Sequence, residues 1–195
     1  MPRNLLLVAS LLITAAAQGG SILTMTYNWS ADGSESDQLG RLSRNGVQST
    51  WSATKQTPPL FNSTLNDFTL FTLNSGVYSH IEVTITQLTQ HNVYSAAYSI
   101  FNPNDPTANY LADAGLSSGA PPTPFSYQCI LPTGTNFEVA LSTVNGVASA
   151  ANGSTQILVE GFFDADRSEA PEPATVVLLG CGVGILGLFS RFRRA

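Results

Sequence analysis

The sequence predicts an all-β protein: an antiparallel, jelly-roll-like β-sandwich of about seven strands. Three observations support this fold class. Helix signals are nearly absent from residues 21–166, short runs of residues alternate between apolar and polar, and Gly, Pro and Asn separate these runs. Such alternation is typical of two sheets that pack on one face and meet water on the other.

The first expected strand covers residues 23–29, where Leu23, Met25, Tyr27 and Trp29 alternate with polar side chains. Residues 30–66 are rich in Ser, Asn, Gly and Thr, so we expect long loops there, with one short strand at residues 46–51. Further strands are expected at residues 68–73, 80–88, 93–101, 125–131, 137–141 and 157–163. Because only a short polar turn separates residues 80–88 from residues 93–101, we expect these two strands to form a hairpin.

The first residues have the features of a secretory signal peptide. Arg3 precedes an apolar stretch at residues 5–14, and Ala15, Ala16 and Ala17 provide the small residues that a signal peptidase recognises. We expect residues 1–17 to be removed after passage through the Sec translocon, leaving residues 21–166 as the exported domain. The alternative is a short buried helix at the start of a soluble domain.

The end of the chain contains an uncharged stretch followed by a basic cluster. Residues 174–190 carry no charge, and Arg191, Arg193 and Arg194 follow them. A helix of this length spans about 26 Å, enough to cross a thin bilayer core. We expect a single transmembrane helix within residues 174–195, with the arginines acting as a cytoplasmic stop-transfer signal.

A proline-containing linker at residues 167–173 precedes this span and contains Pro171, Glu172 and Pro173. The two prolines prevent a helix there and keep the backbone extended, which makes it accessible to a protease. Four glycines within the span weaken its helix and permit close approach of another helix.

Three features occur together at the end of the chain: Pro171-Glu172-Pro173-Ala174-Thr175, the glycine-rich apolar residues 176–189, and the terminal arginines. In this order they resemble the PEP-CTERM sorting signal of exported proteins from environmental Gram-negative bacteria. The resemblance implies processing by a membrane-embedded exosortase and an envelope or extracellular destination, often alongside exopolysaccharide. Cys181 within the span is less usual for the family. The alternative is a plain anchor in which Gly180 and Gly184 form a dimerisation face.

A second resemblance covers residues 98–106, 109–115, 125–127 and 131–139. These stretches are similar to a repeated β-sandwich module of bacterial surface proteins, akin to pre-peptidase C-terminal domains. Such modules are non-catalytic appendages, and residues before 68 add little to the likeness.

The charge of the domain argues against anionic partners, and its cysteine content excludes an internal disulfide. Residues 18–170 contain four basic and twelve acidic side chains, a net charge of −8, which argues against nucleic acid and anionic surfaces as partners. The two cysteines are Cys129 in the domain and Cys181 in the tail, so the exported domain cannot form an internal disulfide. We expect Cys129 to be a buried small hydrophobic residue.

No catalytic site is expected. Residues 115–119, Gly-Leu-Ser-Ser-Gly, match the G-x-S-x-G nucleophile motif, but Pro121 and Pro122 prevent the helix that this motif requires. His80 and His91 both lie upstream of the serine, whereas the motif needs a later histidine. Two histidines without neighbouring cysteines are also too few for a structural zinc, so we expect both on the surface at strand edges.

Two groups of residues leave a binding role open. One group gathers side-chain oxygens that suit either calcium or ordinary turns: Asn102, Asn104, Asp105, Asn109 and Asp113. The other offers aromatic rings that suit either the core or a sugar-binding face: Trp29, Trp51, Tyr78, Tyr94 and Tyr110. Turns and core are favoured, and we expect no cofactor or resident metal.

The favoured interpretation is an exported protein of the cell envelope or extracellular matrix, held at least transiently in the inner membrane by its C-terminal helix. We expect a non-enzymatic structural or adhesive role, with exopolysaccharide as a candidate partner. The alternative is a secreted carbohydrate-binding or carbohydrate-active protein.

Overall fold

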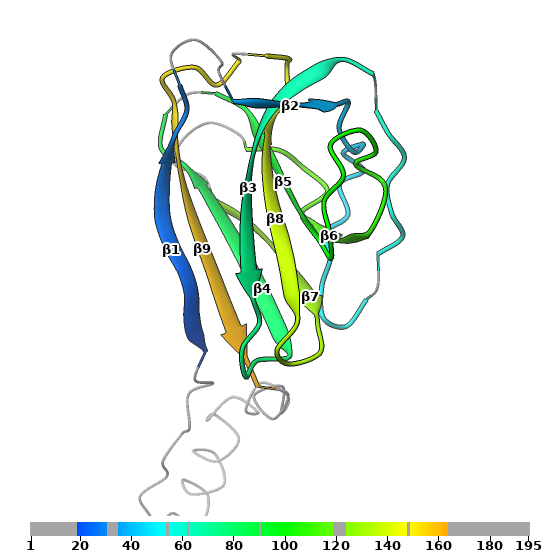
Figure 1. Cartoon of the computed structure of the whole chain (residues 1–195), viewed down its shortest axis with the longest axis vertical. Helices are drawn as coiled ribbons and strands as arrows, with labels where there is room; N and C mark the ends of the chain where they lie inside the picture. The colour runs from blue at the N-terminus through cyan, green and yellow to red at the C-terminus, as the bar shows by residue number, and fades with distance from the viewer. Residues whose placement is uncertain are drawn as a thin grey trace, which may run out of the picture.

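The computed structural model describes residues 19–163 except 31–34, 54, 62, 90, 119–123 and 148. Within these residues the chain forms two antiparallel sheets that pack face to face, so the prediction of an all-β sandwich is confirmed (Figure 1). The predicted signal peptide (1–17), linker (167–173) and tail (174–195) lie outside the described residues. The described part contains no helix with the length and apolarity needed to cross a membrane.

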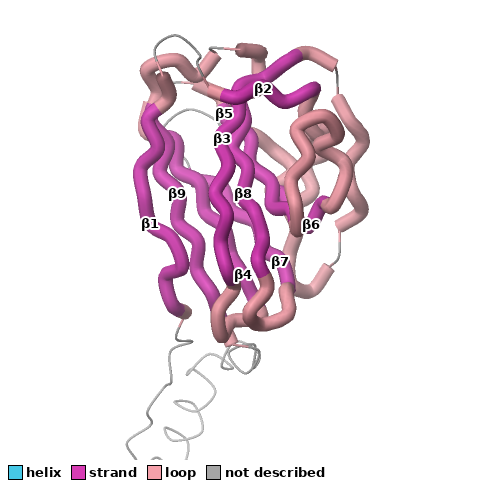
Figure 2. The backbone as a smooth tube through the Cα atoms, in the orientation of Figure 1, coloured by secondary structure: helices cyan, strands magenta, loops and turns pink. Residues whose placement is uncertain are grey.

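The described chain contains nine strands rather than about seven. They are β1 (Gly20–Asn28), β2 (Ser36–Leu39), β3 (Leu65–Asn74), β4 (His80–Gln87), β5 (Val93–Tyr98), β6 (Tyr110–Asp113), β7 (Pro124–Ile130), β8 (Asn136–Thr143) and β9 (Ser154–Phe162). The first sheet has the order β1-β9-β4-β7, and the second has the order β2-β3-β8-β5-β6. Figure 2 shows the two layers and the long loop between β2 and β3, which runs beside β6 and β7.

Two strands were missed, and one predicted strand is absent. β2 and β6 have only four residues each, too few for an alternating pattern to stand out in the sequence. The strand predicted at residues 46–51 is wrong: this segment makes only an isolated bridge between Thr50 and Ala53.

The predicted hairpin between residues 80–88 and 93–101 is also wrong. β4 pairs with β7 and β9 in the first sheet, whereas β5 pairs with β6 and β8 in the second. The chain therefore crosses from one sheet to the other after Gln87. Both strands still bury their apolar sides in the same core, so their sequence pattern does not reveal that they belong to different sheets.

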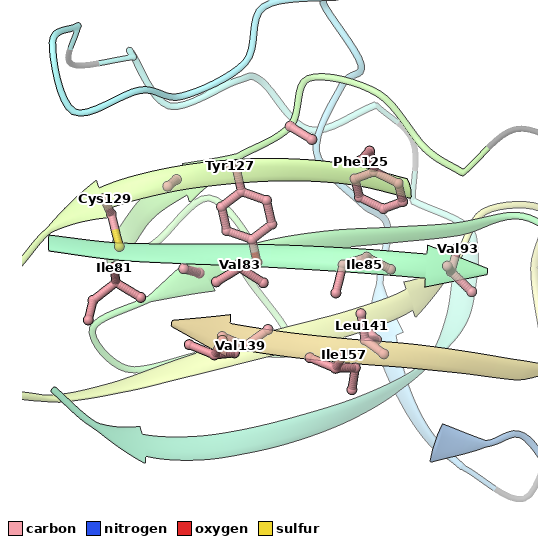
Figure 3. Packing of buried hydrophobic residues seen from close by; sticks show 14 of the residues in the cluster. Ile81, Val83, Ile85, Val93, Phe125, Tyr127, Cys129, Val139, Leu141 and Ile157 are labelled. Atoms are coloured by element: carbon pink, nitrogen blue, oxygen red, sulfur yellow. The ribbon is translucent and has the colours of Figure 1, made fainter. Parts of the chain in front are cut away.

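The main core lies between the two sheets (Figure 3). β4 contributes Ile81, Val83 and Ile85, each fully buried, and every second residue of this strand faces inward. The facing strands supply side chains of the same kind, including Val139 and Leu141 of β8. Burying each such side chain stabilises the fold by about 1.5–3 kcal/mol, so this layer provides much of the stability of the sandwich.

The outer face of the second sheet is not open to water, contrary to the expectation for a sandwich. All six residues of β5 are buried. Tyr94, Ala96 and Tyr98 belong to a second apolar cluster that also contains Leu42 and Phe101 from the neighbouring loops. The loops after β2 and β5 thus cover the outer face of this sheet.

β1 begins and β9 ends at the same end of the sandwich. The two strands are antiparallel neighbours, and Gly20 at the start of β1 lies opposite Gly161 near the end of β9 (Figure 1). The described chain therefore enters and leaves the domain at one end.

Candidate ligand-binding site

A cleft of about 340 Å³ lies beside β6 and β7, at the edge strands of the two sheets. The loop between β2 and β3 provides more than half of its lining. The lining residues are Ser49, Thr50, Trp51, Ala53, Lys55, Gln56, Thr57, Tyr110, Leu111, Gln128, Cys129 and Ile130. They combine hydroxyls, amides, one cation and two aromatic rings, and include no histidine and no carboxylate.

Ser49 ties the loop to both sheets. Its amide donates to the carbonyl oxygen of Asp113 at 2.9 Å, and its own carbonyl accepts from the amide of Gln128 at 3.0 Å. Its hydroxyl also accepts from the Asp113 amide at 3.1 Å. These bonds join β6 to β7 through the loop, so the open side of the sandwich is closed by backbone hydrogen bonds as in a sheet.

Behind the cleft, Lys55 forms an ion pair with Asp113. The Lys55 ammonium donates to Oδ1 of Asp113, and the two side chains are 4% and 0% exposed. A buried charge is tolerated only when it is paired and hydrogen-bonded. This pair therefore holds the lysine side chain in one position against the wall of the cleft.

The Asp113 carboxylate has further donors on both oxygens. Oδ2 accepts from the Tyr110 hydroxyl at 2.6 Å, and Oδ1 also accepts from the amide of Gly115. Charge-assisted bonds of this kind are stronger than neutral ones. The carboxylate is thus fully occupied by groups of the protein itself.

The residues of the oxygen-rich group make hydrogen bonds within the protein. Asp113 is bound by Lys55 rather than free for a cation, and the carboxylate of Asp105 accepts from the amide and hydroxyl of Thr107. Asn102 accepts from the amide of Asn104 at 3.1 Å, and Asn109 donates to the Ile100 carbonyl. The favoured interpretation of these residues as turn formers is the one that the geometry supports.

Trp51 is held at the mouth of the cleft by polar and aromatic contacts. Its indole N–H donates to the carbonyl of Ile81 at 3.2 Å, and its backbone amide donates to the Gln128 side chain at 3.3 Å. Its ring meets His80 and Phe162 edge to face, with centroid distances of 5.5 and 5.3 Å. The ring is half-buried and cannot turn without breaking these contacts.

The five aromatic residues considered for a sugar-binding face do not form one surface. Trp29 and Tyr94 are 3% and 2% exposed and belong to the two apolar clusters. Tyr78 packs against the main core and the ring of Phe163. Only Trp51 and Tyr110 line the cleft, so the structure brings together two of the five.

Four tyrosines lie close to Asp113 and stay protonated. Burial raises the pKa of Tyr94, Tyr98, Tyr110 and Tyr127 above the ordinary value, and the negative charge of Asp113 raises these pKa values further. Tyr127 shares a hydrogen bond of 2.8 Å with Ser95 in the core. These four phenols therefore stay neutral at physiological pH, and Tyr110 is the one among them that lines the cleft.

The prediction that both histidines lie on the surface is wrong for His80, which is 2% exposed. Its Nδ1 shares a hydrogen bond of 2.8 Å with Ser79, and its ring meets that of Trp51. His91 is half-buried and shares a hydrogen bond of 2.9 Å with Thr89. Burial lowers the pKa of His91.

The G-x-S-x-G match does not form a nucleophile site in the described residues. The Ser117 hydroxyl accepts from Arg44 at 2.7 Å, in an exposed loop. Gly115 has a φ of 68° and packs against the backbone of Val47, so this glycine serves a close contact between loops.

Cys129 is a buried apolar residue, as predicted. It is 7% exposed, belongs to the main core, and burial raises the pKa of its thiol to about 12. The residues of the predicted sorting site, Pro171, Glu172, Pro173, Arg191, Arg193 and Arg194, lie outside the described residues.

Lys55 and Ser49 were not recognised from the sequence. One signal was present: Lys55 is the only lysine in the chain, and it stands in a stretch without other charges. Its partner is 58 positions away, and no local pattern connects the two.

Comparisons with known proteins give little further information. No family model matches the chain, and no curated protein matches it. Among solved structures, the chain is similar to the enzymatically active domain of tailspike protein 4 from bacteriophage CBA120, with 13% sequence identity and a TM-score of 0.30. The match covers 70% of this chain and 21% of the tailspike chain, so the chain spans about a fifth of its length. The function proposed below is therefore argued from this chain's own residues.

Proposed function

We propose that this protein is an exported, non-enzymatic structural or adhesive component of the cell envelope or extracellular matrix. The observation that carries the proposal is the C-terminal combination of Pro171-Glu172-Pro173, an uncharged span and three arginines, which resembles a PEP-CTERM signal. The predicted signal peptide at the other end of the sequence supplies the export route. Sec translocon, signal peptidase and an exosortase-type enzyme are the corresponding partners.

The placement of the chain ends supports display of the domain at a surface. β1 begins and β9 ends at the same end of the sandwich, where Gly20 lies opposite Gly161. A domain connected to the membrane at that end presents its opposite end, with the loops after β1, β4 and β8, to the outside. This arrangement suits a surface component.

The chemistry of the cleft supports a non-enzymatic role. Its lining contains no histidine and no carboxylate, and the adjacent Asp113 is occupied by Lys55, Tyr110 and Gly115. Its one cysteine, Cys129, has a thiol pKa raised to about 12 by burial, so it is not a thiolate at neutral pH. These groups can bind a ligand, and the lining provides no histidine or carboxylate that would activate one of its hydroxyls.

Replacing Pro171, Glu172 and Pro173 with alanines tests the sorting part of the proposal. We expect the variant to accumulate in a membrane-held, unprocessed form, whereas the unaltered chain is processed and reaches the surface. Immunoblots of membrane and released fractions separate these forms. Unchanged processing and release in the variant would show that the tail acts only as a membrane anchor.

A carbohydrate-binding or carbohydrate-active protein is the second candidate, because Trp51 and Tyr110 lie together in a cleft lined by amides and hydroxyls. The strand order supports a jelly-roll architecture: without β2, the sheets β1-β9-β4-β7 and β3-β8-β5-β6 form two layers of four strands. Jelly rolls include lectin domains, although a fold alone does not determine a function. A glycan array probed with the purified chain tests binding, and turnover of an arrayed polymer would contradict the non-enzymatic role.

A further inference from the structure

We propose that the cleft beside β6 and β7 binds a neutral sugar residue. Gln56 and Thr57 would provide hydrogen bonds to its hydroxyls, and Trp51 and Ile130 would contact its apolar C–H groups. This inference rests on the second candidate function and assigns it a site and a ligand class.

The size of the cleft fits a small ligand. Its volume is about 340 Å³, near the lower end of the range of about 300–1,000 Å³ typical of small-molecule sites. At about 30 Å³ for each water molecule, it has room for about eleven waters. That space suits one sugar unit of a longer polymer, because the cleft opens at the side of the sandwich rather than inside the core.

The walls of the cleft are fixed before a ligand arrives. Ser49 connects β6 with β7 through its backbone, and Gln128 holds the amide of Trp51 while its own side-chain amide donates to Glu82 at 3.2 Å. Lys55 is fixed by its ion pair with Asp113. A preformed site loses little conformational entropy on binding, which favours affinity for a small polar ligand.

The charge of the cleft indicates a neutral ligand. Lys55 is the only charged residue in the lining, and its charge is compensated by Asp113 directly behind it. A phosphate or carboxylate would have to compete with Asp113 for the ammonium group. The excess of acidic residues in the exported domain also repels anions.

Hydrogen-bonding capacity remains on one side of the cleft. Gln56 and Thr57 are exposed, and their side chains make no hydrogen bond within the described part of the chain. Donors and acceptors that are free and close together match the closely spaced hydroxyls of a sugar.

An apolar surface lies near these polar groups. Ile130 of β7 is 51% exposed, although it belongs to a strand whose neighbouring side chains are packed. The half-buried ring of Trp51 is held in place by the Ile81 carbonyl. A sugar ring has polar hydroxyls at its edge and apolar C–H groups on its faces. It can therefore contact the polar and the apolar surface of the cleft at the same time.

The test measures binding of D-glucose, D-galactose, D-mannose and their common disaccharides to the full-length chain, by saturation-transfer NMR and titration calorimetry. We expect saturable binding of at least one of these neutral sugars. Gln56→Ala and Thr57→Ala should each weaken it about three- to tenfold, as expected for one lost hydrogen bond. Both residues are exposed, so neither substitution should unfold the protein.

Gln156→Ala is the matched control, because Gln156 is an exposed glutamine on β9, away from the cleft lining. It should bind the sugar as the unaltered chain does. The inference is overturned if no neutral sugar in this set binds, or if Gln56→Ala and Gln156→Ala bind equally well. Tighter binding of glucuronate or glucose 6-phosphate than of glucose would overturn the neutral ligand class. Failure of sugar binding with normal tail processing would refute this site and leave the proposed surface role intact.

Discussion

Lys55 donates a hydrogen bond to Asp113 across 58 positions of sequence, and both side chains are buried. The pair connects the long loop between β2 and β3 to the end of β6. Asp113 also binds Tyr110 and the Gly115 amide, so one carboxylate joins the loop that carries Lys55 to β6 and the turn after it. This buried ion pair therefore helps to fix the shape of the candidate site, together with the hydrogen bonds of Ser49 and Trp51.

Lys55→Met should destabilise the protein by about 3–5 kcal/mol, because it leaves the Asp113 charge buried without a cation. The free energy of unfolding from urea titrations monitored by circular dichroism measures this loss. The double variant Lys55→Met/Asp113→Asn should lose less free energy of unfolding than Lys55→Met alone, since asparagine removes the charge and keeps an acceptor oxygen.

Arg44→Met serves as the control for this prediction. Arg44 bonds the Ser117 hydroxyl in an exposed loop, and surface substitutions of this kind usually change stability by no more than about 0.5 kcal/mol. Equal unfolding midpoints for Lys55→Met and Arg44→Met would show that the buried ion pair contributes no more to stability than the exposed Arg44 does.

Gly115→Ala should be more destabilising than Gly46→Ala. Both glycines have positive φ, 68° and 73°, so alanine is strained at either position. A Cβ at Gly46 meets nothing, whereas one at Gly115 would overlap the backbone of Val47. We expect an additional loss of about 1–3 kcal/mol at Gly115 from this overpacking. Thermal melts of the two variants compare the positions directly, and equal melting temperatures would contradict the close contact.

Alkaline pH should unfold the protein through its buried tyrosines. Burial raises the pKa of Tyr98 and Tyr127 above the ordinary value of 10.0, so the folded state keeps protons that the unfolded chain loses above pH 10. The stability contributed by these phenols is present below that pH and falls as the pH rises above it. Phenolate absorbance should therefore appear together with the loss of near-ultraviolet circular dichroism.

Tyr98→Phe should reduce the dependence of stability on pH in this alkaline range, because it removes one phenol whose pKa is raised by burial. Phenolate absorbance that rises fully near pH 10 while the fold stays intact would contradict the burial of these side chains.

The Cys129 thiol should resist disulfide reagents while the domain is folded. Its burial and its raised pKa of about 12 leave little thiolate at mildly alkaline pH. In a Cys181→Ser variant, which leaves Cys129 as the remaining thiol, Ellman's reagent should react only after urea is added. Rapid reaction without urea would show that the core around β7 opens readily.

The sequence pattern was most informative where strands are long and have one buried face. Ile81, Val83 and Ile85 alternate with polar residues, and all three are buried in β4 as expected. β2 and β6 gave no such pattern because they are short, and the burial of Tyr94 and Tyr98 on the outer face of β5 depends on loops elsewhere in the chain. Loops cover that face, and their position is not a local property of the strand.

The candidate site was less accessible to prediction from sequence. Trp51 and Tyr110 were recognised as aromatic residues that could bind a sugar, but Lys55, Ser49 and Gln128 were not. Asp113 was grouped with nearby asparagines because they are close in sequence, whereas its actual partner is a lysine in a distant loop.

The all-β class, the apolar faces of the long strands and the burial of Cys129 could be predicted from the sequence, since each of these follows from local alternation of side chains. The sequence also carries the predicted export and sorting segments. The assignment of β4 and β5 to different sheets, and the closure of one side of the sandwich by the loop between β2 and β3, became visible in the folded structure. Strand partners and buried ion pairs depend on contacts between distant residues, and their free energy is gained only when the two sheets pack together.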